Sequence, residues 1–374
     1  MENKICVYAI CKNESKFVEQ WLNSMSEADY IVVLDTGSED ATFEMLRNDS
    51  RVYRAEQAVI TPWRFDVARN ESMKLIPDDA NILVCTDLDE LLEPGWADIL
   101  RANWVDGVHE RCVYKYAWSH NPDGSAARVF QYDKIHNRDW VWNFPVHECL
   151  VRPYNLLEGT YASEHTLMLF DYIYLHHYPD STKSRSTYLP LLEIRKHENP
   201  CDYYSKLYLA HEYYYNGKYE ESIAELCDIL DNHRANYTST EQASCFLFMG
   251  DSYKQLNDLG NAIICYQKGI LADPTYRECY VNLAQALLEM QYYDQAIGVI
   301  KQCFRSSYRH YIWLERDASW TYEPYDILAI AYYYLEDYDA SLNNVVKAIH
   351  YNPTNEQLLT NLALIEQKLF KEVK

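Results

Sequence analysis

The sequence predicts an α/β domain over residues 1–195, followed by an all-helical repeat domain over residues 196–374. In the first half, apolar runs of strand length end in polar residues and lead into amphipathic helical stretches. This alternation is typical of a mostly parallel sheet with helices on both faces. In the second half the hydrophobic period is helical and recurs about every 34 residues. A chain of 374 residues is long enough for about two hydrophobic cores.

Two strand–turn–helix units begin the chain. Residues 5–10 and 30–34 are continuous apolar runs, and each is followed by a turn and an amphipathic helical stretch. The second run leads into Asp35, and Gly37 lies in the turn. Asp35 and the polar residues after it are suited to turning the chain and capping a helix, and equally to hydrogen bonding with a ribose or a base.

A third strand is predicted at residues 51–54, and the helix after it carries Phe65, Ala68 and Met73 on its core-facing side. This pattern places Arg69 on the exposed side of that helix. Arg69 then either forms an ordinary surface ion pair or faces a bound diphosphate from the edge of the sheet.

The fourth predicted strand, residues 82–85, runs into Asp87 and Asp89. If the backbone stays extended there, the two side chains point the same way, because residues two apart share a face. Few basic residues are nearby in the sequence, so the pair is suited to a hard divalent cation that also binds a diphosphate. The alternative is a solvated acidic turn that caps a helix beginning near Pro94.

Alternating patterns predict further strands at residues 108–118 and 127–131. Two histidine-containing clusters follow. The first includes His147 and Glu148 after an aromatic-rich run, and the second includes His176 and His177. A His-Glu pair alone is usually structural, and this one does not have the His-Glu-x-x-His order of a zinc-peptidase helix.

Four short motifs in the first half occur in a recognisable order. They are Lys12-Asn13-Glu14, Asp35-Thr36-Gly37-Ser38-x-Asp40-x-Thr42, Phe65-x-x-Ala68-Arg69-Asn70 and Asp87-x-Asp89. Together they resemble the family 2 glycosyltransferases of the GT-A fold over roughly the first 180 residues. More narrowly, they are similar to a bacterial subgroup that carries a helical-repeat tail and includes peptide glycosyltransferases. The resemblance implies a Rossmann-like mixed sheet in the N-terminal domain.

The resemblance also implies a donor site for a UDP-sugar. By it, Asp87 contacts the ribose or a metal-bound water, and Asp89 ligates Mn²⁺ or Mg²⁺ on the diphosphate. The metal acts as a Lewis acid for the departing UDP. The other donor-binding residues that it implies are Ala9, Lys12, Glu14, Asp35 and Arg69, of which Ala9, Glu14 and Asp35 line the uridine pocket.

On the acceptor side, the resemblance implies that Glu148 is the general base and that His147 organises the site. It implies that a histidine after a late strand completes the metal site. His177 aligns better than His176, although Pro179-Asp180 replaces the Gly-Tyr that the subgroup carries, so the alternative histidine stays open. Beyond it, Lys183 and Arg185 either supply positive charge for the leaving diphosphate or are solvated helix residues.

Composition limits the partners. The formal net charge of −22 argues against nucleic acid, because a phosphate backbone needs a basic face, and against anionic membrane surfaces. The N-terminus lacks a signal-peptide core, and no apolar run approaches the roughly 18 residues that span a bilayer. The 11 cysteines form no Cys-x-x-Cys pair, and an odd number of them in a chain lacking a secretion signal favours reduced thiols. We therefore expect a cytoplasmic protein.

The second half has the spacing of tetratricopeptide repeats. Gly250, Tyr253, Ala262, Tyr266 and Pro274 fit the repeat positions, and about 34 residues later they are followed by a second copy that contains Ala284, Leu287, Ala296 and Ile300. An earlier and a later copy are displaced by 40 and 45 residues (250 − 210 and 329 − 284), which predicts short insertions, one of them around residues 313–320. About four helix pairs are expected.

The tail has two interpretations. A concave, tyrosine-lined surface suits a polypeptide acceptor or a second copy of the chain. Alternatively, most of the tyrosines are core residues of the repeat, with buried rings and solvated hydroxyls. The whole sequence then predicts a metal-dependent inverting glycosyltransferase that moves a hexose or N-acetylhexosamine from a UDP-sugar to a polypeptide. The alternatives are a glycan acceptor, or a repeat-based scaffold with an inactive transferase domain.

Overall fold

The computed structural model describes residues 3–121, 123–153, 165–180, 186–200 and 202–372. The chain divides into two compact units. Unit 1 comprises Met1–His120 and Val129–Glu198, and unit 2 comprises Asn121–Arg128 and Asn199–Lys374. Unit 1 thus extends three residues beyond the predicted boundary at 195. Arg195 is buried and donates from Nη1 to the carbonyl oxygens of Val146 and His147, at 3.1 and 2.8 Å, and Arg64 Nη1 donates to Glu198 Oε1 at 2.7 Å.

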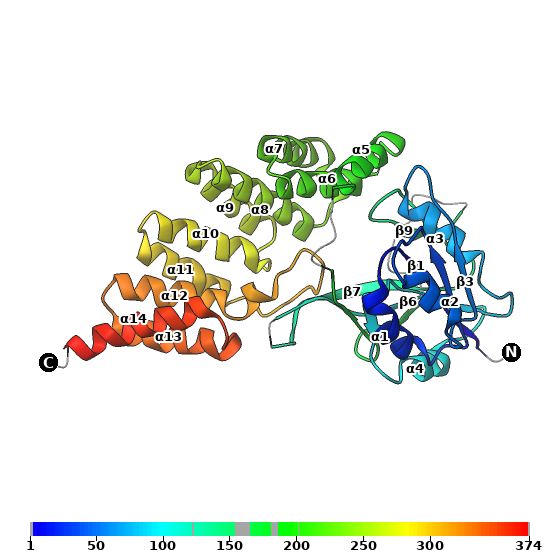
Figure 1. Cartoon of the computed structure of the whole chain (residues 1–374). Helices are drawn as coiled ribbons and strands as arrows, with labels where there is room; N and C mark the ends of the chain where they lie inside the picture. Colours follow the sequence, from blue (N-terminus) through cyan, green and yellow to red (C-terminus); the bar gives the residue numbers. More distant parts are fainter. Residues whose placement is uncertain (1–2, 122, 154–164, 181–185, 201, 373–374) are drawn as a thin grey trace. The chain divides into compact units, whose positions relative to one another are not determined.

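A mixed sheet forms the centre of unit 1 (Figure 1). Among the described residues it has nine strands in the order β3-β2-β1-β4-β7-β6-β11-β5, with β10 paired to β6. The strands are β1 (Ile5–Cys11), β2 (Tyr30–Asp35), β3 (Arg54–Gln57), β4 (Ile82–Cys85), β5 (Glu90–Leu92), β6 (Arg111–His120), β7 (Ala126–His136), β10 (Thr166–Met168) and β11 (Tyr174–His177). A separate antiparallel ribbon pairs β8 (Val141–Asn143) with β9 (Cys149–Val151).

The first four strands of this order are parallel, and β7 runs antiparallel to β4. Every residue of β1 and β4 is buried, as expected for parallel strands covered on both faces. The helices of unit 1 are α1 (Ser15–Met25), α2 (Thr42–Asn48), α3 (Phe65–Met73), α4 (Trp96–Asn103) and α5 (Tyr188–Glu198). Ala68 of α3 packs into one core with Tyr8 and Leu83 of the sheet.

The third strand lies three residues later than residues 51–54. Arg51 belongs to a turn, because its backbone N–H and its guanidinium both bind the Asp49 carboxylate. The ladder to β2 begins only at Arg54, which pairs with Val32. Local side-chain capping therefore takes priority over the apparent strand propensity at this point.

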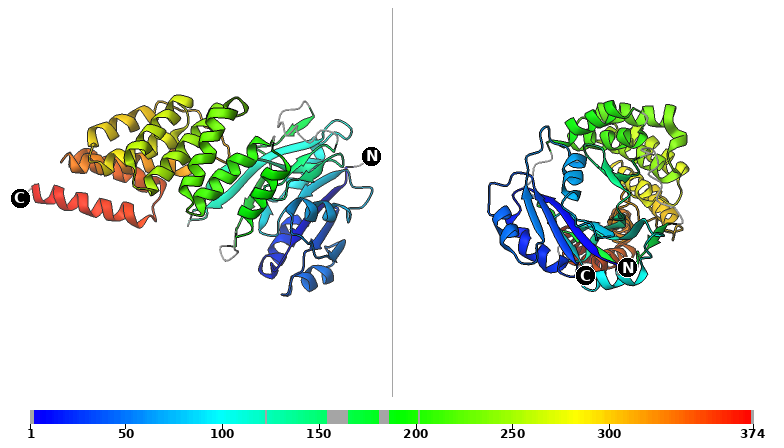
Figure 2. Two further views of the ribbon diagram at one scale, coloured as in Figure 1. Left: turned by 90° about the horizontal axis from the view of Figure 1, so that it is seen from above. Right: turned by 90° about the vertical axis from the view of Figure 1, so that its right-hand side faces the viewer.

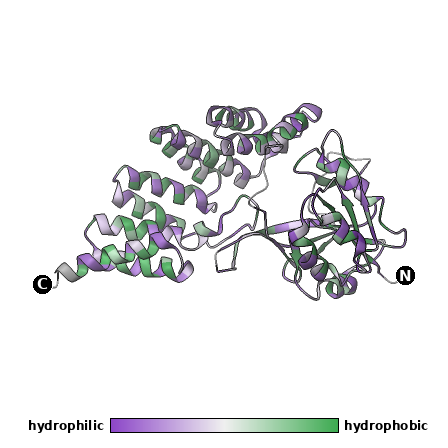
Figure 3. Cartoon of the chain, in the orientation of Figure 1, coloured by the Kyte–Doolittle hydropathy of each residue, from purple (hydrophilic) through white to green (hydrophobic). Residues whose placement is uncertain are grey.

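Unit 2 is a stack of antiparallel helix pairs (Figure 2). Its α-helices are α6 (Tyr203–Tyr215), α7 (Tyr219–Asp228), α8 (Ser239–Gln255), α9 (Leu259–Ala272), α10 (Arg277–Glu289), α11 (Tyr293–Cys303), α12 (Glu323–Tyr334), α13 (Tyr338–Tyr351) and α14 (Glu356–Glu372). Hydrophobic and hydrophilic residues are interleaved along these helices (Figure 3). Residues 304–322 separate α11 from α12, which confirms the predicted insertion around residues 313–320.

The first helices of successive pairs pack directly on one another, α6 on α8, α8 on α10 and α10 on α12. Small residues allow the close approach within a pair, and Gly250 of α8 lies against the ring of Tyr266 in α9. Two tyrosine hydroxyls in this core are bonded to protein. Tyr266 donates to Asp251 Oδ1 at 2.7 Å, and Tyr276 donates to the Leu314 carbonyl oxygen at 2.8 Å. The expectation of solvated hydroxyls is therefore wrong for both residues.

Among the described residues, no helix combines the length and the apolar character needed to cross a membrane.

Candidate active site

The candidate site lies at the carboxyl edge of the parallel strands, where polar residues follow β1, β2 and β4. Cys11 at the end of β1 pairs with Asp35 at the end of β2. Cys85 at the end of β4 pairs with Tyr8, so β4 ends at the same edge but three residues before β1. Such an edge is where open α/β sheets bind ligands. Asp87 and Asp89 follow β4 directly.

Asp35 is buried and holds the turn after β2. Its Oδ1 accepts hydrogen bonds from the backbone N–H groups of Gly37 and Ser38, at 2.9 and 2.8 Å, and from Gln57 Nε2 at 2.9 Å. Burial raises the pKa of the Asp35 carboxyl, but these hydrogen bonds lower the pKa by more than burial raises it. The net pKa therefore lies below the usual value. The side chain is therefore fixed and ionised at the edge of the sheet.

Three further residues predicted to bind the donor lie in or just after β1, and they differ in how exposed they are. Ala9 lies inside β1 with no exposed surface, so the structure does not bring its side chain to the edge. Lys12 is exposed in the turn after β1. Glu14 is 6% exposed at the start of α1, and its backbone N–H donates to Thr42 Oγ1 at 2.7 Å.

Arg69 is buried, not exposed, which corrects the prediction for α3. Its guanidinium links three side chains that the sequence separates. Nε donates to Glu148 Oε1 at 2.6 Å, Nη2 lies 3.0 Å from Asp87 Oδ1, and Nη1 donates to Cys85 Sγ at 3.2 Å. Two carboxylates compensate the buried cation, and for that reason a charged residue occupies an inward position of the helix.

Lys134 of β7 is the second cation at Asp87, and the sequence analysis did not identify it. Its Nζ lies 3.2 Å from Asp87 Oδ2 and 3.1 Å from Glu90 Oε1. Burial raises the pKa of Asp87, but Arg69 and Lys134 lower it by more than burial raises it. The net pKa of Asp87 therefore lies well below its usual range. The prediction that few basic groups neutralise this carboxylate is therefore wrong. Lys134 shares one face of its strand with Phe130, Tyr132 and His136, because residues two apart point the same way. A lysine in such a row of aromatic residues is a signal that could have indicated a buried cation.

Asp87 and Asp89 do not point the same way. The chain turns directly after β4, because the Glu90 backbone N–H donates to the Asp87 carbonyl oxygen at 3.0 Å. The condition of an extended backbone is therefore not met. Asp87 faces Arg69 and Lys134, whereas Asp89 faces His177 of β11.

Asp89 and His177 form a pair of the type that binds a divalent cation. His177 Nε2 lies 3.5 Å from Asp89 Oδ2, and Nδ1 lies 3.0 Å from the Trp118 carbonyl oxygen. A carbonyl oxygen only accepts, so Nδ1 carries a proton. Burial lowers the pKa of His177, but the Asp89 carboxylate more than offsets this, so the net pKa lies above its usual value and Nε2 faces Asp89 as a donor. A cation bound here would replace that proton on Nε2. A backbone carbonyl in this position is a common orienting partner of metal-binding histidines.

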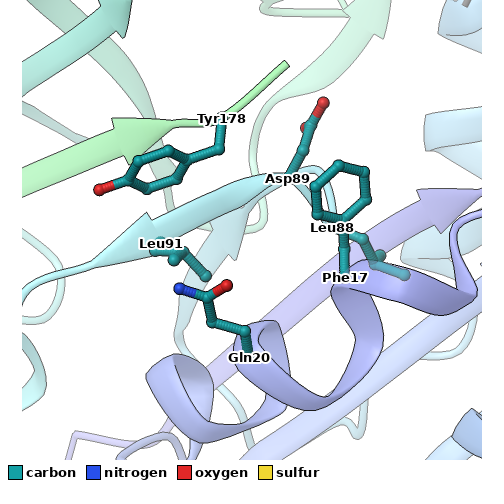
Figure 4. A pocket seen from close by; sticks show the side chains of 6 residues that line it. All are labelled: Phe17, Gln20, Leu88, Asp89, Leu91 and Tyr178. Carbon is teal, nitrogen blue, oxygen red and sulfur yellow. The ribbon is translucent and has the colours of Figure 1, made fainter. Parts of the chain in front are cut away.

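The donor set fits Mn²⁺ or Mg²⁺ only if the substrate completes it. Among residues 3–121, 123–153, 165–180, 186–200 and 202–372, no group of three or more His, Cys, Asp or Glu side chains converges on one point. One carboxylate and one imidazole are a sufficient protein contribution where phosphate oxygens and water supply the other ligands. Asp89 also borders a small hollow lined by Phe17, Gln20, Leu88, Leu91 and Tyr178 (Figure 4).

His176 is directed elsewhere, because adjacent strand residues point to opposite sides. Its Nε2 lies 2.9 Å from Glu93 Oε1, and its Nδ1 lies 3.0 Å from His120 Nε2. The structure therefore places His177, and not His176, beside Asp89. Lys183 and Arg185 lie outside the described residues.

The predicted acceptor-side residues flank Arg69. Glu148 accepts from Arg69, as described above, so one of its oxygens is engaged in an ion pair. His147 has a positive φ of 47°, and its ring contacts Tyr188 with centroids 5.7 Å apart. His147 thus lies at a constrained turn next to Glu148.

Comparison with known proteins identifies the repeats of unit 2. A family model described as a tetratricopeptide repeat matches residues 243–276 and 278–310, which confirms the repeat predicted from Gly250 and Tyr266. None of the curated proteins matches this chain.

Solved structures similar to this chain include two tetratricopeptide proteins. The first tetratricopeptide domain of the human RPAP3 protein is 19% identical, with 34% of this chain and 93% of that chain covered and a TM-score of 0.31. TTC0263, a thermophilic tetratricopeptide protein from Thermus thermophilus, is 16% identical, with 49% of this chain and 90% of that chain covered and a TM-score of 0.36.

Proposed function

We propose that unit 1 is a GT-A-type domain and that the chain is a metal-dependent inverting glycosyltransferase using a UDP-sugar. The observation that carries the proposal is the Asp89–His177 pair, with Nδ1 of the histidine fixed by a backbone carbonyl. The order of the four motifs that resemble family 2 glycosyltransferases supports it, as does the mixed sheet, in which four parallel strands are followed by an antiparallel one.

In this proposal Asp35 and Asp87 bind the nucleoside part of the donor. Both carboxylates are ionised and fixed, Asp35 by the turn after β2 and Asp87 by Arg69 and Lys134. The Asp87 side chain is 30% exposed, so a ribose hydroxyl can reach it. Pre-organised acceptors of this kind cost little reorganisation when the donor binds.

Asp89 and His177 hold the divalent cation, which when bound stabilises the negative charge on the departing diphosphate. Glu148 takes the proton of the acceptor nucleophile. The nucleophile forms its bond to the anomeric carbon as the bond from that carbon to the diphosphate oxygen breaks and UDP leaves. Inversion at that carbon and a polypeptide acceptor both rest on the resemblance.

The first experiment measures hydrolysis of UDP-glucose, UDP-GlcNAc and UDP-galactose by the purified protein with Mn²⁺, Mg²⁺ or EDTA. We expect slow release of UDP from one donor, and we expect EDTA to abolish it. Asp89→Asn should lower this rate at least about 100-fold, the upper end of what losing a supporting metal contact costs.

Glu93→Gln is the matched control, because Glu93 forms a similar carboxylate–histidine pair with the neighbouring His176. It should leave the rate of UDP release within about twofold of the unaltered protein, since an exposed pair of this kind contributes little. If no donor is hydrolysed and calorimetry detects no UDP binding with metal present, the repeat-based scaffold with an inactive domain becomes the better assignment. The tetratricopeptide match favours that second candidate.

A further inference from the structure

Residues 304–322, here called the inserted segment, form an unusually long connection in unit 2. Two other connections from one pair to the next are short, namely residues 273–276 between α9 and α10 and residues 352–355 between α13 and α14. The inserted segment joins α11 to α12 and includes one short 3₁₀ turn, Asp317–Trp320. Long loops in compact domains usually have a function of their own.

The inserted segment contacts the first helices of three successive pairs through an aromatic anchor. Trp313 lies against Tyr208 and His211 of α6, with ring centroids 5.4 and 5.5 Å apart. It also packs on the hydrophobic cores around α8 and α10. Leu314, the next residue, is 6% exposed within the core that contains Tyr276.

The residues after Trp313 make hydrogen bonds to α10 and to Tyr276, the residue before it. Tyr276 donates to the Leu314 carbonyl oxygen at 2.8 Å, and the Arg316 backbone N–H donates to Glu278 Oε1 at 2.7 Å. Arg316 Nη2 donates to Asn282 Oδ1 at 2.9 Å. Asn282 in turn donates to Asp251 Oδ1 of α8 at 2.7 Å, so a single network joins the segment to two helices.

The segment also holds its own shape. Glu315 is 2% exposed, and its carboxylate accepts from the backbone N–H groups of His310 and Tyr311, with His310 at 3.1 Å and Tyr311 at 2.6 Å. This fold-back presents two side chains to the helices, those of Trp313 and Arg316, which are three residues apart in the sequence. The arrangement is that of a bound peptide with one aromatic and one cationic anchor.

We infer that the inserted segment is an intramolecular ligand of unit 2, seated on the face formed by α6, α8 and α10 and recognised through Trp313 and Arg316. Glu278 has no exposed surface, and the segment supplies the donor to its Oε1, the Arg316 backbone N–H. While the segment is seated, this face is closed to a polypeptide partner. A partner of the chain therefore docks on another surface. The inference does not depend on the proposed enzymatic activity.

The test separates the segment from its face. In one variant, residues 305–320 are replaced by a four-residue Gly-Ser linker, and a fluorescent peptide of residues 307–321 is added in solution. We expect the peptide to bind this variant and not the intact chain. A peptide carrying Trp313→Ala and Arg316→Met should bind neither. Equal binding to the variant and the intact chain, or no binding to a variant with a native circular dichroism spectrum, would overturn the inference.

A second measurement on the intact chain covers the case in which the linker variant does not fold. Hydrogen exchange should show protection at residues 311–316, where the N–H groups of Tyr311 and Arg316 bind buried carboxylates. The double substitution Trp313→Ala and Arg316→Met should accelerate exchange there at least tenfold. Tyr308→Ala is the control, because that side chain is 63% exposed, and it should change little. Exchange of residues 311–316 at the rate of an open chain in the unaltered protein would overturn the inference.

Discussion

At the scale of single residues, the buried guanidinium of Arg69 is the main electrostatic contact of the candidate site. Replacing it by methionine removes one of the two cations at Asp87 and the ion-pair partner of Glu148, and leaves two partly buried carboxylates less compensated. We expect Arg69→Met to lower the free energy of unfolding of unit 1 by about 3–5 kcal/mol. Urea titration followed by hydrogen exchange of β4 measures this loss. Arg47→Met is the control, since its ion pair with Glu44 is exposed and contributes about 0.5 kcal/mol at most.

Because Glu148 is paired with Arg69, it could act either as the general base or as a residue that positions Arg69, and substitutions distinguish these two roles. If Glu148 is the general base, Glu148→Gln and Glu148→Ala should both lower transfer or hydrolysis by about 100-fold or more, because neither side chain takes a proton. If Glu148 mainly positions Arg69, glutamine keeps an acceptor for Nε and should retain most activity, whereas alanine loses it. The proposed mechanism predicts the first result. If Glu148→Gln retained activity and Glu148→Ala lost it, the general base would be a residue other than Glu148.

The residues also show where prediction from sequence ends. The placement of Asp35 and Asp87 at one sheet edge follows from strand order, which apolar patterning indicates. The contact of Lys134 with Asp87 joins positions 47 residues apart, and no local pattern specifies which strand lies beside β4. Arg69 was expected outside because helical periodicity describes apolar residues and cannot show that two distant carboxylates compensate a buried charge.

At the scale of elements, close packing in unit 2 depends on the small residues that the repeat spacing predicted. A Cβ atom at Gly250 would overlap the buried ring of Tyr266. Gly250→Ala should therefore lower the free energy of unfolding of unit 2 by about 1–3 kcal/mol. Gly298→Ala, in α11, is the matched control, because the added Cβ would meet no atom within 4 Å beyond its chain neighbours and the backbone of its own helix. It should raise stability by up to about 1 kcal/mol through helix propensity. Thermal unfolding of both variants gives the comparison.

The α10 helix contributes a pH dependence. Burial raises the pKa of Glu278 to about 7, although Arg316 lowers it, and the ordinary value is 4.5. The folded chain therefore keeps this proton to higher pH than the unfolded chain. Its contribution to stability is complete below about pH 4.5 and is lost as the pH rises to about 7.

Glu278→Gln isolates that contribution, because glutamine stays neutral. The free energy of unfolding of the unaltered protein minus that of Glu278→Gln should fall between pH 4.5 and pH 7. At about 1.4 kcal/mol per pKa unit, the fall is on the order of 3 kcal/mol. Urea unfolding at several pH values measures it, and a difference that does not change with pH would contradict the prediction.

At the scale of the whole molecule, the two units have separate hydrophobic cores, around β1, β4 and α3 in unit 1 and between the paired helices in unit 2. A ligand that binds only the folded form of one unit stabilises that unit by mass action. UDP with Mn²⁺ at about 100 times its dissociation constant should therefore slow hydrogen exchange in unit 1 by an amount equivalent to about 2.7 kcal/mol.

Unit 2 should show no such change, because its helices carry none of the proposed donor or metal ligands. The effect in unit 1 should disappear in Asp89→Asn and persist in Glu93→Gln, which ties it to the Asp89–His177 pair and not to the general charge of the sheet edge. Equal protection of both units would mean that they unfold together, whereas protection that survives Asp89→Asn would place the metal at other residues. Because exchange reports on each segment separately, the same experiment distinguishes a donor site in unit 1 from a scaffold that binds no nucleotide.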